Sequence, residues 1–178
     1  MTFNDNANIG GGRVSRRAKG GIAAGGGVGL VAIIAFVITQ LTGINVAPLA
    51  DQIVSGTGGG GQSVQVDCET GAQANENIDC RMDGAYASLD TYWAEMVKGY
   101  RSPADFALFE GGVSTGCGNA TSAVGPFYCP ADESIYIDTS FFAELSSRYG
   151  ASTGPLAQLY VVAHEWGHHI QNLIGQMD

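Results

Sequence analysis

Residues 155–174 read PLAQLYVVAHEWGHHIQNLI, and within them residues 164–168 read His-Glu-Trp-Gly-His. Pro155 suits the first turn of a helix and Gly175 suits the position just after a helix end. The stretch therefore predicts a helix from about Pro155 to Ile174. The apolar residues expected to face the core from this helix are Leu156, Leu159, Val162 and Ala163.

The chain has three histidines, and all of them lie in this predicted helix. His164 and His168 are four residues apart, so a helix projects both rings from one face toward a single Zn²⁺ ion. Glu165 then lies beside the metal, where it can accept a proton from water activated by zinc. The pattern predicts peptide hydrolysis, with His164 and His168 as metal ligands and Glu165 as the general base. His169 points about 100° away from His168 on the helix, which favours a structural role.

A third zinc ligand is not evident in the sequence. A catalytic zinc site normally has three protein ligands and one open position. After His168 only His169 remains as a histidine, and no Glu follows. The upstream carboxylates Glu110, Asp138 and Glu144 are candidates that their spacing does not single out. Two hypotheses stay open: a zinc-dependent peptidase, or a non-catalytic membrane-anchored binding module with an incomplete zinc site.

A charge-free segment near the N-terminus predicts a membrane span. Residues 21–38 are apolar apart from glycines, and a helix needs roughly 20 such residues to cross a bilayer. Four of the eight basic residues precede this segment, within the first nineteen positions. Basic residues stay on the cytoplasmic side, so we expect a single-pass cell-membrane protein with a cytoplasmic head at residues 1–20 and a signal anchor at residues 21–44. A cleaved signal peptide and a buried core helix are the alternatives.

The remaining segments follow from composition and charge. Residues 45–66 are rich in glycine and predict a flexible tether, which leaves residues 67–178 as an extracytoplasmic domain. The net charge is −9, and the residues from Asp51 onward carry sixteen acids against four basic residues. This balance argues against nucleic-acid binding. The expected partners are a peptide or protein substrate and, through residues 21–44, the lipid bilayer; the oligomeric state stays open.

The four cysteines fall into two pairs with equal spacing, Cys68 with Cys80 and Cys117 with Cys129. Disulfides form on the outer side of a membrane, and each of these pairs closes a short loop. Of the three possible pairings we favour these two local bridges. A structural zinc site is the alternative, but its ligands usually come as C-x2–4-C pairs, which the chain lacks.

Outside the last helix, the sequence indicates four further segments. Apolar residues at helical spacing predict a helix over Asp83–Gly99. Residues 103–130 are rich in Gly, Ser, Pro and Cys and predict a long loop. A short strand over Ser134–Asp138 and a short helix over Phe141–Tyr149 follow.

Several of these segments together resemble the neutral zinc metallopeptidase family of bacteria. The residues that carry the resemblance are Cys117–Ala120, Gly125–Asp132, Ile135–Asp138, His164–Asn172, the Asp79-Cys80-Arg81 and Tyr92-Trp93 motifs and the basic head with its glycine-rich anchor. The resemblance implies an α+β, zincin-like domain, preceded here by one N-terminal transmembrane helix. It also implies that the strand around Tyr136 borders the cleft, where an extended substrate adds as a neighbouring strand.

The resemblance also implies where the third ligand lies. Family members continue into a second helix whose Glu-x-x-Ala-Asp type motif resembles a ligand motif, and this sequence ends before it. We therefore expect a domain that is truncated at its C-terminal end, or one that departs from the family and is inactive. The resemblance names no physiological substrate.

Overall fold

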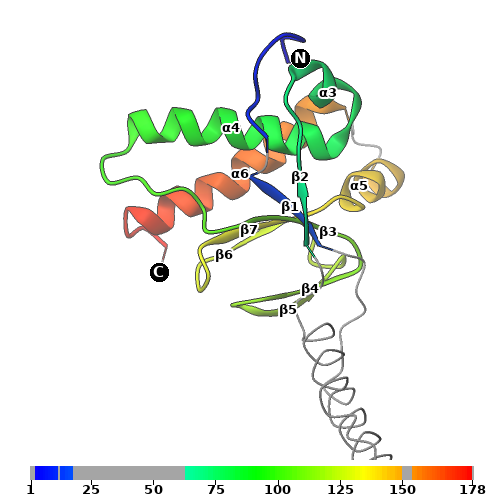
Figure 1. Ribbon diagram of the computed structural model, residues 1–178. Helices are drawn as coiled ribbons and strands as arrows, with labels where there is room; N and C mark the ends of the chain where they lie inside the picture. The colour runs from blue at the N-terminus through cyan, green and yellow to red at the C-terminus, as the bar shows by residue number, and fades with distance from the viewer. Residues whose placement is uncertain (1–2, 12, 18–62, 150–153, 178) are drawn as a thin grey trace, which may run out of the picture.

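The computed structural model describes residues 3–11, 13–17, 63–149 and 154–177, which form an α+β unit (Figure 1). Its strands are β1 (Val14–Arg17), β2 (Ser63–Val66), β3 (Phe106–Phe109), β4 (Gly112–Thr115), β5 (Gly118–Thr121), β6 (Phe127–Cys129) and β7 (Ser134–Asp138). Its helices are α3 (Gly71–Glu76), α4 (Ile78–Met96), α5 (Phe141–Tyr149) and α6 (Pro155–Leu173).

Five of the strands form one mixed sheet in the order β2-β1-β3-β7-β6. The three central strands are parallel to one another, and the two outer strands, β2 and β6, run antiparallel to their neighbours. Strands β4 and β5 form a separate antiparallel hairpin. Within the described residues, β6 is one of the two outer strands of the sheet, and it contacts α6.

The two faces of the sheet are buried by different elements, because successive side chains in a strand point to opposite faces. Phe106, Leu108, Ile135 and Ile137 belong to the larger core, together with residues of α4 and α6. Their neighbours in the same strands, among them Ala107, Phe109 and Tyr136, pack with Val113 and Ala120 of the β4–β5 hairpin. Figure 1 shows α4 and α6 on one side of the sheet and the hairpin on the other.

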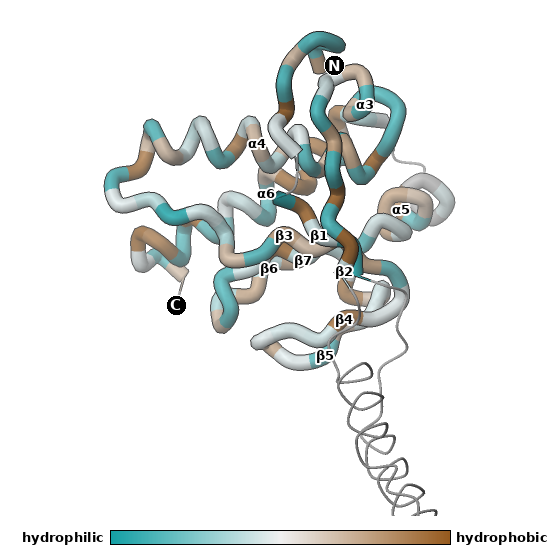
Figure 2. The backbone as a smooth tube through the Cα atoms, viewed as in Figure 1, coloured by the Kyte–Doolittle hydropathy of each residue, from teal (hydrophilic) through white to brown (hydrophobic). Residues whose placement is uncertain are grey.

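Helix α4 begins five residues before the predicted start at Asp83. Its N-cap is Asn77, whose side chain accepts hydrogen bonds from the backbone N–H groups of Asp79 and Cys80. Asparagine is among the best N-cap residues, so this short signal adds more than a turn to the helix. Residues 80–86 of α4 are all buried, whereas residues 91–96 are mostly exposed, and hydrophobic and hydrophilic residues are mixed along the helix (Figure 2).

Of the other predicted segments, one strand and two helices are confirmed and the long loop is wrong. Strand β7 and helix α5 have the predicted bounds, and α6 ends one residue before the predicted Ile174. The long loop predicted at residues 103–130 is wrong, because this region holds β3, β4, β5 and β6. Each of these strands has only three or four residues, which is too short for an alternation of apolar and polar residues to stand out.

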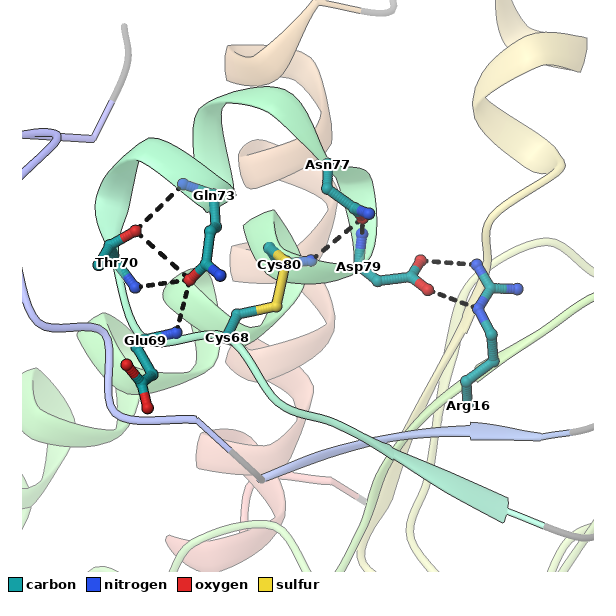
Figure 3. The surroundings of a disulfide bond; sticks show 8 residues. All are labelled: Arg16, Cys68, Glu69, Thr70, Gln73, Asn77, Asp79 and Cys80. Carbon is teal, nitrogen blue, oxygen red and sulfur yellow. Dashed lines mark hydrogen bonds and ion pairs between the residues drawn. A yellow bond between two sulfur atoms is a disulfide. The ribbon is translucent and has the colours of Figure 1, made fainter.

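Both favoured disulfides are confirmed: Cys68 bonds to Cys80, and Cys117 bonds to Cys129. The first bridge ties the segment after β2 to the first turn of α4 (Figure 3). The second ties the turn of the β4–β5 hairpin to the end of β6. Each bridge therefore holds two neighbouring elements together and does not serve as a metal ligand set.

The basic residues near the N-terminus are bound to acids of the same unit. Arg16 donates two hydrogen bonds of 2.6 Å to the carboxylate of Asp79 (Figure 3), and it also lies 3.5 Å from Glu110. Arg13 pairs with Asp90 and Arg17 with Asp105. These acidic partners neutralise Arg16 and Arg17, so a strand with two arginines is stable inside the sheet.

The predicted single-pass membrane topology is wrong. In the parts of the chain that the structure describes, no helix is long and apolar enough to cross a membrane, and the expected anchor at residues 21–44 lies outside them. Arg17 and Ser63 are paired residues of neighbouring strands. A single crossing between them would place these two paired residues on opposite sides of a bilayer. Residues 14–17 are thus part of the sheet. We therefore do not retain three predictions: a preceding transmembrane helix, lipid contact through residues 21–44, and an extracytoplasmic domain opposite a cytoplasmic head.

The contact between Arg16 and Asp79 gives a stability prediction. We expect Arg16→Gln to lower the free energy of unfolding by about 2 kcal/mol, because it removes a two-fold, charge-assisted contact between half-buried groups. Arg101→Gln is the matched control: Arg101 pairs with Glu133 at an exposed position, and such pairs contribute about 0–1 kcal/mol. Urea unfolding of both variants measures the difference. Equal losses would show that Arg16 does not hold the N-terminal strand in place.

Candidate metal and catalytic site

Helix α6 packs on the sheet through one face and leaves the other open. Val162, Trp166, His169 and Ile170 are buried, whereas His164 is exposed and His168 is half-buried. The predicted apolar stripe is wrong at two positions, because Leu156 is 58% exposed and Ala163 is also exposed.

Trp166 anchors the buried face of the helix. Its side chain is fully buried, and its ring lies 5.1 Å from that of Tyr86 on α4 and 6.3 Å from that of Phe106 on β3, measured between centroids. Burial of an aromatic side chain contributes about 2–3 kcal/mol. With Trp166 fixed against the sheet, residues two before and two after it in sequence must point away from the core.

The first turns of α6 are held by a buried polar contact. Arg81 of α4 donates to the side-chain oxygen of Gln158 at 2.7 Å and to the backbone carbonyl of Asn75 at 2.6 Å. Both Arg81 and Gln158 are 8% exposed. This contact joins α4, α6 and Asn75 of α3, so it limits rotation of α6 about its axis.

The two histidines expected to bind metal are brought together. Their Nε2 atoms lie 3.2 Å apart, and the Nδ1 atom of His168 lies 3.0 Å from Oε1 of Gln171. Since the amide oxygen of Gln171 accepts a hydrogen bond, Nδ1 of His168 carries the proton and its Nε2 presents a lone pair. Two nitrogens bound to one tetrahedral Zn²⁺ at about 2.05 Å lie about 3.3 Å apart. The spacing of the pair therefore fits a shared zinc ion.

Glu165 lies at the boundary between the buried and open faces of α6. It is 7% exposed, and burial raises the pKa of its carboxyl above the usual value of 4.5. The neighbouring His164 and His168 and the backbone N–H of Tyr128, which donates to the carboxylate, partly offset this rise in pKa. A carboxyl group with a raised pKa is better matched to accepting a proton near neutral pH.

No third ligand joins the pair within the described part of the chain, where no three His, Cys, Asp or Glu side chains gather. Glu110 accepts hydrogen bonds from Thr139 and Arg16. Asp138 is fully buried and accepts from the hydroxyl of Ser140 at 2.7 Å. Glu110 and Asp138 therefore serve the sheet and its turns, and Glu144 lies in the first turn of α5. What the structure assembles is two imidazoles and one carboxyl group.

The structure changes the expected role of the strand around Tyr136. Tyr136 pairs with Ala107 on one side and with Phe127 on the other, so a substrate cannot add beside it as a neighbouring strand. Its side chain belongs to the core on the hairpin side of the sheet, away from α6.

The sequence did not single out Tyr128, the residue of β6 that faces α6. The Tyr128 hydroxyl contacts His169 and Asn172, and its backbone N–H contacts Glu165. The alternation within Phe127-Tyr128-Cys129 could have placed Tyr128 on the helix side, had β6 been recognised as a strand.

The chain belongs to the family described as "Putative neutral zinc metallopeptidase", whose sequence model matches residues 2–178. An uncharacterized protein of Mycobacterium tuberculosis is 52% identical over 108 residues, which are 61% of this chain and 36% of that protein. The uncharacterized protein YpfJ of Escherichia coli is 44% identical over 93 residues, 50% of this chain and 32% of that protein. The chain thus spans about a third of the length of these curated relatives. No solved structure matches it.

The raised pKa of Glu165 predicts a pH-dependent stability in the metal-free protein. Folding favours the neutral form of the Glu165 carboxyl group. The protonated group therefore makes its full contribution to the free energy of unfolding below pH 4.5, and this contribution is lost as the pH rises through the pKa of Glu165 in the folded state. Glu165→Gln stays neutral throughout. We therefore expect this variant to be more stable than the wild type at pH 7, with a difference that shrinks toward zero at pH 4.

Urea unfolding at both pH values, in the presence of a chelator, measures this difference. Glu95→Gln, at an exposed position of α4, is the control for the same loss of one charge. A stabilisation by Glu165→Gln that is equal at pH 4 and pH 7 would contradict the role of burial.

Proposed function

We propose that this chain carries the zinc-binding helix of a zinc-dependent peptidase, in which His164 and His168 hold the metal and Glu165 is the general base. The observation that carries the proposal is the pair of Nε2 atoms 3.2 Å apart on the open face of α6. Membership of a zinc metallopeptidase family supports the same chemistry.

The arrangement of the pair is compatible with a shared zinc ion. With Nδ1 of His168 donating to Gln171, its Nε2 is a lone pair aimed at the Nε2 of His164. A proton on Nε2 of His164 satisfies this contact in the metal-free protein, and a cation shared by the two nitrogens satisfies it when metal is bound. Neutral imidazole nitrogen is a common zinc ligand, and a hydrogen bond on its far nitrogen fixes the ring for binding.

Zinc bound at such a site supplies Lewis acidity, which polarises a peptide carbonyl and lowers the pKa of water. The residues of this chain supply the other requirements. Glu165 follows His164 on the helix and accepts the proton of the attacking water, then donates it to the leaving amine. Burial shields its carboxyl group from water and raises its pKa, and the backbone of Tyr128 partly offsets this rise.

The substrate class we propose is a peptide or protein, which follows from the family and from the residue types of the site. A second candidate function is a binding module that holds zinc without hydrolysis. It is favoured by the absence of a third donor beside His164 and His168 among residues 3–11, 13–17, 63–149 and 154–177. The two functions share His164 and His168 and differ in whether a third ligand completes the site for hydrolysis.

Separate measurements of metal binding and hydrolysis test these functions. We expect His164→Ala and His168→Ala to lower zinc affinity at least tenfold in calorimetric titrations, because each removes one of two imidazole ligands. Glu165→Gln should bind zinc as the wild type does, while hydrolysis of an unfolded protein substrate falls by about 10²–10⁴-fold. Gln171→Ala is the control for loss of the orienting hydrogen bond and should weaken zinc by a smaller factor.

The outcomes separate the two functions. Zinc binding that is unchanged by both histidine substitutions would refute the metal site. Hydrolysis that survives in Glu165→Gln would refute the base. Zinc binding by the pair without any hydrolysis in the wild type would favour the binding module.

A further inference from the structure

The β4–β5 hairpin covers one face of the main sheet without joining its hydrogen-bonded ladder. Among the described residues its two strands pair only with each other. Val113 and Ala120 point inward from the hairpin and are 8% and 9% exposed. They pack over Phe109, Phe127 and Tyr136 on the side of the sheet opposite α4 and α6 (Figure 1). The hairpin is therefore attached to the sheet by side-chain contacts and by its ends.

The base of the hairpin is closed on itself. The backbone N–H of Gly111 donates to Oγ of Ser122 at 2.9 Å, and the N–H of Ser122 donates to the carbonyl of Gly111 at 3.0 Å. Gly111 and Gly125, which flank the hairpin, have φ angles of 85° and 77°. Glycine adopts such angles at no steric cost, and residues at the ends of an element commonly serve as hinges. The hairpin can therefore turn about its base as one unit.

The tip of the hairpin is held by the disulfide between Cys117 and Cys129. Cys117 lies in the turn between β4 and β5 and is exposed, whereas Cys129 ends β6 and is fully buried. One hydrogen bond supports the same contact: the N–H of Gly116 donates to Oδ2 of Asp132 at 2.6 Å, at an exposed position. Because water replaces an exposed hydrogen bond at little cost, the disulfide is the stronger hold on the tip.

The two disulfides differ in how a reductant can reach them. Cys68 and Cys80 are 4% and 8% exposed, so both ends of their bridge are buried. Cys117 gives the other bridge one exposed end. Thiol–disulfide exchange requires a thiolate to reach a sulfur atom, and exposed disulfides are the ones that thiols open readily. A thiol reductant should therefore open the bridge between Cys117 and Cys129 first.

We propose that the β4–β5 hairpin is a redox-controlled cover, which the Cys117–Cys129 bridge locks onto the sheet. A dithiol that reduces this bridge releases the hairpin and uncovers Phe109, Phe127 and Tyr136. A two-stranded hairpin is at best marginally stable alone, so the loss of its covalent hold favours release. The cover lies on the face opposite α6, and it does not depend on the proposed function.

The reduction transfers two electrons from the dithiol to the bridge. One thiolate of the dithiol attacks Sγ of Cys117, and the electron pair of the broken S–S bond leaves on Sγ of Cys129, which takes up a proton. The second thiol of the reductant then attacks the mixed disulfide and frees Cys117 as a thiol. The dithiol becomes a disulfide, and the bridge becomes two thiols.

The order in which the bridges open is the first test. The metal-free full chain is titrated with dithiothreitol in the presence of a chelator, and free thiols are alkylated with iodoacetamide and located by mass spectrometry. We expect the Cys117–Cys129 bridge to be half reduced at a concentration at least about tenfold below that needed for Cys68–Cys80. A smaller separation, or the reverse order, overturns the inference.

The release of the hairpin is the second test, and Cys129 reports on it because the docked hairpin buries this residue. After selective reduction, the alkylation rates of the two freed thiols are compared. Release exposes both of them, so we expect Cys129 to react within about tenfold of the rate of Cys117. A Cys129 thiol that reacts more slowly than this shows that the hairpin stays docked, and it overturns the inference.

A pair of double variants separates the lock from a general loss of stability. Cys117→Ala with Cys129→Ala removes the lock, and Cys68→Ala with Cys80→Ala is the matched control, since each bridge joins cysteines 12 residues apart. We expect amide hydrogen exchange in residues 112–121 to be at least about fivefold faster in the first variant and unchanged in the second. Equal exchange rates in the two variants contradict the lock. If either variant fails to fold, the wild type before and after selective reduction decides, and unchanged exchange in residues 112–121 there overturns the inference.

Discussion

The site depends on the burial of Trp166 against Tyr86 and Phe106. Once this ring is fixed in the core, the period of the α-helix assigns every other position of α6 to a face. His164 and His168 are then directed outward together, and Glu165 falls at the boundary, where it is 7% exposed. A rotation of the helix by one position would bury a metal ligand and expose the base. The contact of Arg81 with Gln158 opposes that rotation at the other end of the helix.

The same constraint extends to the sheet that α6 covers. Its central strands come from segments far apart in the chain, because β1 at residues 14–17 lies between β2 at residues 63–66 and β3 at residues 106–109. Strand β1 contributes Val14, fully buried, to the core that receives Trp166. The carboxylates of Asp79 and Asp105 neutralise its two arginines. An acidic unit thus uses the basic N-terminal residues to complete the sheet that supports the site.

The sequence was informative where one strong local signal decides the structure. The Pro at the start of α6 and the equal intervals between cysteines each led to a prediction that the structure confirms. The spacing of His164 and His168 correctly predicted that their rings lie together, and their role as metal ligands stays a prediction. It was misleading for β1, because Arg16 and Arg17 appear unpaired in sequence and their acidic partners lie more than sixty residues away. The role of Tyr128 was equally hidden, since it depends on a three-residue strand and on partners 41 and 44 residues distant.

The open face of α6 also limits how the site can be completed. Leu156 and Tyr160 lie in line with His164 and His168 at intervals of four residues, and they are 58% and 70% exposed. The opposite face of the helix is filled by the sheet and α4, and β6 with Tyr128 closes the side next to Glu165. Within the described residues no third His, Cys, Asp or Glu side chain joins the pair as a metal ligand. A third ligand or a bound substrate can therefore approach His164 and His168 only across the face that carries Leu156 and Tyr160. The segment or substrate that binds there also covers these two exposed side chains.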